Sequence, residues 1–136
     1  MSDEQNLRTI IDEISTIENG VSKGRAHMDD NCVVIRPSGN PLSMAGWDAM
    51  FQRDDVIIDS ERLVDIRDIK IQGEMAYAWY VTHSQFTYKN VTNDDVSVFT
   101  AIFKKMYNND SNGQWKMIHG QRSTGRKPDE RPPYFD

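Results

Sequence analysis

Apolar residues recur at helical spacing near the start of the chain and at alternating spacing through its second half. The first apolar set runs from Leu7 to Val21 in steps of three or four residues, which is typical of one buried helix face. We predict a helix from about Glu4 to Asn19, stopped by Gly20, and a second, shorter helix from about Val21 to Met28.

The middle of the chain predicts one short strand and one short helix. Cys32–Arg36 is rich in β-branched residues and is short, which favours a strand. Pro37–Pro41 has the residues of a loop. Ser43 is placed to cap a helix that runs from Met44 to about Arg53.

Polar and apolar residues then alternate with the period of a strand through most of the remaining sequence. We predict turns or loops at 72–74, 89–95 and 108–113. The long strands that these connections separate are Arg62–Gln72, Met75–Tyr88, Val96–Tyr107 and Gln114–Ser123.

The order of elements, helices first and long antiparallel strands afterwards, predicts an α+β domain. The long strands carry apolar residues on both faces, whereas an antiparallel sheet with one face in water has a polar face. Either helices cover one face and a second subunit covers the other, or helices and loops cover both. We favour the first arrangement because the chain has only about three predicted helices.

The last strand also carries a family resemblance. The run Trp115–Ser123 is similar to the end of the association domain of calcium/calmodulin-dependent protein kinase. Paired helices ending in Met28-Asp29-Asp30, the strand 32–35 and a short helix near Ala45-Gly46-Trp47 precede it in the matching order. Over about residues 4–125, the chain therefore resembles the nuclear transport factor 2-like superfamily, close to its SnoaL-like and kinase-association branches.

The resemblance implies a cone-shaped fold, also described as a cystatin-like roll, in which a bent antiparallel sheet wraps the N-terminal helices and leaves a pocket. It implies homodimers or larger rings built through the outer face of the sheet. We accordingly expect one domain over residues 1–125, followed by a polar, proline-containing tail over residues 126–136.

The superfamily contains enzymes and non-enzymes, so the resemblance does not decide the function. Ketosteroid isomerase-type members place a carboxylate base near the end of the first strand. Here that stretch is Val34-Ile35-Arg36-Pro37, and the positive charge of Arg36 counts against this chemistry. Dehydratase-type members use a histidine–aspartate pair with tyrosines. Histidines and tyrosines are present here, but their spacing does not define a site.

Arg122 is the main candidate for function. On a strand it shares a face with Gly120, whose missing side chain would leave room for a ligand. Arg122 either meets a ligand carboxylate or pairs with an acidic side chain, such as Asp29 or Asp30, and holds the fold. Further pocket candidates are Arg36, His27, Tyr80, Thr82 and Ser84, and for the last three the alternative is ordinary strand packing.

The residues that point to the other face of the same strands are predicted to form a subunit interface, provided that no bulge shifts the alternation. A metal or acid–base site on that face is the less favoured alternative. The interface candidates are Trp79, His83, Trp115, His119 and Gln121.

The composition limits the kinds of partner and the compartment that we expect for this protein. The formal charge of −5 argues against nucleic acid and anionic membranes, and no apolar run approaches the length of a membrane span. The start of the chain is polar and acidic, unlike a secretory signal, and Cys32 is the only cysteine, which fits a reducing compartment. We expect a cytoplasmic protein, with no metal or cofactor.

The sequence therefore favours a homo-oligomer that holds a small, anionic organic molecule between Arg36 and Arg122. The first alternative is an enzyme of the SnoaL or dehydratase type that uses His27 or Tyr80 as acid or base. The second alternative is a module for assembly or scaffolding.

Overall fold

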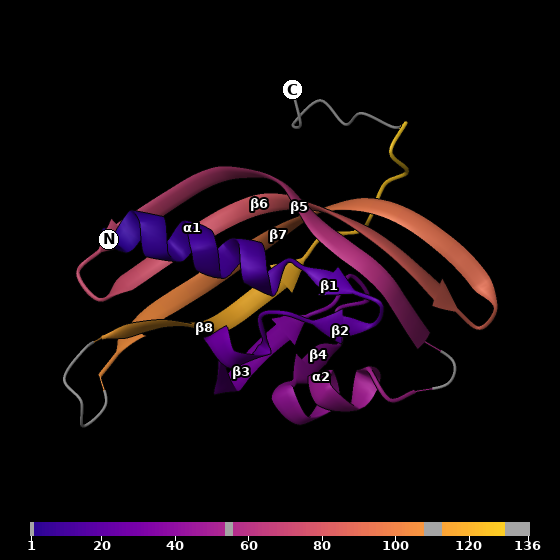
Figure 1. Ribbon diagram of the computed structural model, residues 1–136, viewed down its shortest axis with the longest axis horizontal. Helices are drawn as coiled ribbons and strands as arrows, with labels where there is room; N and C mark the ends of the chain where they lie inside the picture. The colour runs from indigo at the N-terminus through magenta and orange to yellow at the C-terminus, as the bar shows by residue number, and fades with distance from the viewer. Residues whose placement is uncertain (1, 54–55, 108–112, 130–136) are drawn as a thin grey trace.

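The computed structural model describes residues 2–53, 56–107 and 113–129. Its elements form one curled sheet with both α-helices on the same side of it (Figure 1). In chain order they are α1 (Asp3–Ile14), β1 (Ile17–Glu18), β2 (Val21–Ser22), the 3-10 turn η1 (Arg25–His27), β3 (Met28–Ile35), β4 (Pro41–Ser43), α2 (Met44–Met50), β5 (Val56–Gln72), β6 (Met75–Tyr88), β7 (Val91–Met106) and β8 (Gln114–Arg122).

The eight strands lie in the order β2-β1-β5-β6-β7-β8-β3-β4, and only the β3–β8 pair is parallel. The register of β5 against β6 shifts at three places, between Ile58 and Ser60, Leu63 and Asp65, and Ile66 and Asp68. Each β-bulge bends the strand and increases its twist, so the sheet curls around the helices. The predicted α+β class with a bent antiparallel sheet is confirmed.

The first helix packs its apolar stripe against a part of the sheet that is lined by small residues. Ser2 and Gln5 form a capping box, which satisfies backbone donors at the helix start. The buried residues of α1 are Leu7, Ile10, Ile11 and Ile14. They share one core cluster with Ala76, Ala78 and Ala101, whose short side chains let the helix approach the strands.

The helix is shorter than its apolar spacing predicts. It ends at Ile14, and Ile17–Glu18 pairs with Val21–Ser22 as a small hairpin. Asn19 and Gly20 form the turn with φ of 51° and 76°, the left-handed geometry that favours an Asn-Gly hairpin turn. The predicted second helix is wrong, because only η1 is helical between Val21 and Met28.

The β6 strand is confirmed with the predicted bounds, and so is the cap of α2, where Ser43 Oγ accepts from the Gly46 N–H at 3.1 Å. The predicted loop at 89–95 is wrong. Lys89 and Asn90 alone make the turn, with φ of 48° and 68°, and β7 starts at once. The predicted turn at 108–113 falls mostly outside the described residues.

A bulge in β8 changes which residues share a face. Ile102 pairs with His119, but Phe103 pairs with Met117, so Ile118 is the extra residue. Trp115 consequently points inward, is 3% exposed and is not on the outer face, contrary to the prediction. His119 and Gln121 keep the predicted outer face, while Gly120 and Arg122 lie on the inner face.

One face of the sheet points away from α1 and α2 (Figure 1). The strand pairing gives this face many apolar residues. Direct strand pairing places its members side by side, for example Trp79 beside Thr100 and Val81 beside Val98. We call it the outer sheet face; it consists of Val33, Ile35, Tyr77, Trp79, Val81, His83, Val98, Thr100, Ile102, His119 and Gln121.

The start of the predicted tail is attached to the sheet. Arg126 exchanges two backbone hydrogen bonds with Val96, at 2.6 and 2.8 Å. The remainder of the tail from residue 130 lies outside the described residues, so the predicted boundary at residue 125 stays a prediction.

Asp3 connects the start of α1 to the far end of the sheet, and this contact predicts a pH dependence. Its Oδ1 accepts from Trp115 Nε1 and from Lys105 Nζ, each at 3.1 Å. These two bonds lower the pKa of Asp3 below its ordinary 3.8, so the stabilisation is present above that value and is lost as the pH falls through the lower, folded pKa.

Asp3→Asn should therefore reduce the loss of stability between pH 5 and pH 2, since the variant has no carboxylate to protonate. Urea unfolding across that range measures the effect. Asp12→Asn, on the same helix, is the control and should keep the wild-type acid slope. Equal slopes for wild type and Asp3→Asn would contradict the assignment.

Candidate functional site

The inner face of the sheet contains a pocket of about 450 Å³, bounded by the end of β3, the loop after it, α2 and strands β5 to β7. This size is within the usual range for small-molecule sites. The side chains from the first half of the chain are Ile17, Val34, Arg36, Pro37, Ser38, Asn40, Leu42, Trp47, Met50 and Arg53. The second half contributes Ile58, Glu61, Ser84, Phe86, Tyr88, Asp95, Ser97, Arg122 and Gly125.

The pocket has an apolar body, a charged deep end and a polar rim. Val34 and Trp47 are buried in its wall, whereas residues 37–40 are exposed at its rim. The lining contains three arginines and two carboxylates, which gives it a net positive charge inside an acidic protein. A concave, mostly apolar cavity with a few polar groups is the usual form of a binding site for small organic molecules.

A buried ion pair forms the deep end. Arg122 Nη2 donates to Glu61 Oε1 at 2.7 Å, and the two side chains are 21% and 6% exposed. Ser84 Oγ donates to the same Glu61 oxygen at 2.6 Å, and Arg122 Nη1 donates to Thr82 Oγ1 at 3.0 Å. The carboxylate is thus paired and hydrogen-bonded, as a buried charge requires.

Strand register brings these groups together. Glu61 on β5 lies directly opposite Ser84 on β6, and Arg122 on β8 lies opposite Phe99 on β7. The Phe99 ring supports the guanidinium at 5.3 Å and stacks with Tyr80 at 5.4 Å. A Cβ at residue 120 would come within 2.6 Å of Phe99, so Gly120 gives room to this ring and not, as predicted, to a ligand.

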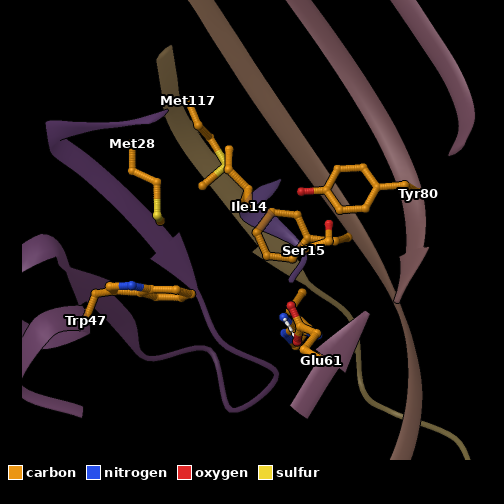
Figure 2. Close-up of a pocket in the computed structure, with 9 residues that line it drawn as sticks. Ile14, Ser15, Met28, Trp47, Glu61, Tyr80 and Met117 are labelled. Carbon is orange, nitrogen blue, oxygen red and sulfur yellow. Dashed lines mark hydrogen bonds and ion pairs between the residues drawn. The ribbon is translucent and has the colours of Figure 1, made fainter. Parts of the chain in front are cut away.

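A second, much smaller cavity of about 10 Å³ lies beside the ion pair; we call it the inner chamber (Figure 2). It shares Trp47, Glu61 and Arg122 with the pocket, so it lies directly behind the pocket's deep wall. Its remaining lining consists of Ile14, Ser15, Met28, Tyr80, Phe99 and Met117.

Three polar atoms around the inner chamber are buried: Tyr80 OH, Ser15 Oγ and Trp47 Nε1. Within the described residues Trp47 Nε1 has no hydrogen-bond partner, and the two hydroxyls have none besides one another. Figure 2 shows the Tyr80 and Ser15 hydroxyls turned toward one another. Burial, and secondly the negative charge of Glu61, raise the pKa of Tyr80 above its ordinary value, so its hydroxyl keeps its proton. Buried polar groups are nearly always satisfied, so this cluster calls for an explanation.

The structure separates the predicted pocket residues. Arg36, Ser84 and Arg122 line the pocket, and Tyr80 lines the inner chamber. Thr82 lies behind the pocket and holds Arg122. His27 is not in either lining, because η1 places it against α1, where its Nε2 contacts Glu13.

Glu61 is the site residue that sequence reasoning missed. The partner of Arg122 was predicted to be an acid such as Asp29 or Asp30, but neither of these pairs with it. The need of a buried arginine for a carboxylate was a usable signal. The predicted strand began one residue after Glu61, and only the pairing of β5 with β6 places Glu61 opposite Ser84 and within reach of Arg122.

The predicted interface histidines are both half-buried on the outer sheet face. His83 lies between two charged neighbours: its Nδ1 is 3.1 Å from Arg62 Nη2, and its Nε2 contacts Asp94. These contacts cross strands β5, β6 and β7, so His83 has a structural role within one chain. Trp79 and Gln121 lie on the same face, without Trp115.

Solved structures with the same architecture define the class of protein. An NTF2-like protein of unknown function from Prochlorococcus marinus is 29% identical and superposes with a TM-score of 0.76, over 93% of this chain and 96% of its own. An NTF2-like protein with a cystatin-like fold from Novosphingobium aromaticivorans is 11% identical, with a TM-score of 0.64 over 95% and 84% of the two chains.

A further neighbour bears the name of the kind of domain that the last strand resembles. It is a putative calcium/calmodulin-dependent kinase II association domain from Exiguobacterium sibiricum, 11% identical, with a TM-score of 0.70 over 95% of this chain and 97% of its own. The fold is therefore NTF2-like, as the sequence predicted. The chain belongs to the family DUF3804, described as a protein of unknown function, whose model matches residues 2–129.

No protein of curated function is detectably similar to this chain. Within the part of the chain that the structure describes, no helix is long and apolar enough to cross a membrane.

The deep ion pair generates a stability prediction. Arg122→Met should lower the free energy of unfolding by about 3 kcal/mol, because the carboxylate of Glu61 would stay buried without its cation. Arg122→Met combined with Glu61→Gln should recover much of this loss, since the charge is then removed as well. Urea unfolding of the single and double variants measures both values.

The matched control is Arg8→Met, which breaks the exposed 3.7 Å contact between Arg8 and Glu4 on α1. An exposed pair of this kind contributes less than about 1 kcal/mol. If Arg122→Met cost no more than Arg8→Met, the buried pair would not stabilise the fold.

Proposed function

We propose that this protein binds a small amphipathic organic acid in the 450 Å³ pocket. The observation that carries the proposal is the position of Arg36 at the rim, above apolar walls. Its Nε has a 3.4 Å contact with the Asn40 carbonyl, and no carboxylate pairs with it in the described residues. A half-exposed guanidinium of this kind has N–H donors available for a ligand carboxylate.

The two predicted cations have different roles in this proposal. The charge of Arg122 is compensated by Glu61, so the deep end is a balanced pair of donor and acceptor. Arg36 keeps its positive charge near solvent, where an acid group is least costly to bring in. The ligand carboxylate is therefore placed at Arg36, with the apolar part against Leu42, Trp47 and Phe86.

The enzyme alternative has less support from the geometry. His27 lies outside the pocket lining, and the raised pKa of Tyr80 makes it a poor base. Glu61 is occupied by Arg122 and Ser84. Binding without turnover needs none of these groups to exchange protons.

Isothermal titration with straight-chain alkanoates and their neutral amides tests the proposal. Wild type should prefer each acid over its amide, and Arg36→Gln should weaken acid binding about tenfold, the usual effect of one charge-assisted hydrogen bond. The control Arg8→Gln changes the net charge equally, away from the pocket, and should keep the preference. The absence of binding by every acid would refute the proposal.

A second proposal concerns assembly: we infer that two copies of the chain associate through the outer sheet face. The half-buried Trp79, Val98 and Ile102, together with the buried Val81, lie on the side of the sheet that neither α1 nor α2 covers (Figure 1). Contiguous apolar surface of this kind is typical of contacts between proteins. The family resemblance favours a second copy as the partner.

Val98→Asp should shift the protein from dimer to monomer, because it would place an unpaired charge at the centre of the contact. Sedimentation velocity at micromolar concentration measures the change. Val91→Asp, on the same strand at a position 61% exposed, is the matched control and should stay dimeric. A monomeric wild type at these concentrations would refute the shared-sheet arrangement.

A further inference from the structure

The inner chamber is a separate feature from the pocket that receives the acid. Its size of about 10 Å³ corresponds to a single oxygen-sized atom. Tyr80 and Ser15 are each 1% exposed, and Trp47 is 7% exposed. Trp47 Nε1 has no partner within the described residues, and the hydroxyls of Tyr80 and Ser15 have none there besides one another, so hydrogen-bonding capacity is left over in a buried site.

The hydrogen-bonding properties of Trp47, Tyr80 and Ser15 indicate which kind of atom the inner chamber would hold. The Trp47 indole is a donor only, and the Tyr80 hydroxyl keeps its proton because it is buried and near Glu61. The Ser15 hydroxyl rotates freely to donate. Together they favour an atom that accepts hydrogen bonds. The ion pair of Glu61 and Arg122 beside the chamber is balanced and offers no unpaired positive charge to an anion, so a neutral acceptor fits best.

We propose that the inner chamber is a subsite for a neutral carbonyl oxygen of the ligand, held by Tyr80 and Ser15. This inference rests on the proposed function, and it narrows the ligand class from organic acids to oxo acids. In this arrangement the carboxylate binds Arg36 at the rim, the carbon chain crosses the pocket, and the ketone oxygen lies in the inner chamber, next to the residues that line both cavities: Trp47, Glu61 and Arg122.

Matched pairs of acids provide the test, because each pair differs only in one carbonyl group. Levulinate, acetylbutyrate and acetylvalerate are compared by isothermal titration with valerate, hexanoate and heptanoate, so that the series spans several distances between carboxylate and ketone. At least one oxo acid should bind roughly fivefold to tenfold more tightly than its matched alkanoate, as expected for one or two hydrogen bonds in a buried site.

Tyr80→Phe removes the hydroxyl but keeps the ring that stacks on Phe99. It should abolish the preference for the oxo acid and leave the affinity for the alkanoate unchanged. Ser15→Ala should reduce the preference in the same way. Tyr77→Phe is the matched control, on the same strand but 48% exposed on the outer sheet face, and should keep the full preference.

The outcomes separate this inference from the proposed function. If both members of every pair bind equally to wild type, the chamber holds only solvent and the inference is overturned, while acid binding stands. If neither series binds, the proposed function and this inference both fail. Thermal melting of Tyr80→Phe should match wild type, and an altered fold in that variant leaves Ser15→Ala to decide the outcome by the same preference.

Discussion

The curvature of the eight-stranded sheet is the constraint on which the rest of the structure depends. Three register shifts in β5 bend the strand, and the sheet that follows it closes around α1. Without this bend, Glu61 on β5 and Arg122 on β8 would stay separated by the two strands between them. The bend turns the inner face into a concave surface, so residues from four strands converge on one ion pair.

That ion pair also gives the two predicted cations different surroundings. Glu61 compensates the charge of Arg122 at the deep end, whereas Arg36 at the rim has no carboxylate partner within the described residues. The Phe99 ring stacks on Tyr80, so the contacts of the ion pair continue toward the core. Packing against Phe99 supports the guanidinium on one side and fixes the Tyr80 ring on the other, next to the inner chamber.

The two faces of the sheet differ in what covers them. The inner face has its own helices, and small alanines on β6 and β7 make room for α1. The outer sheet face has apolar residues without a helix above them (Figure 1). This difference follows from the order of elements, since the chain has only two α-helices among the described residues and both cross the same side.

The sequence by itself determined the α+β class, the long strand at Met75–Tyr88, the cap at Ser43 and the shared face of Tyr80, Thr82 and Ser84, because alternation and local capping are short-range properties. Only the tertiary structure decided the positions that depend on bulges. The extra residue in β8 moves Trp115 to the inner face and into the core. The pairing of Glu61 with Arg122 depends on contacts between strands that are far apart in the sequence. The positions of the bulges depend on how strands that are distant in the sequence pair with one another. The local pattern of polar and apolar residues therefore does not predict them.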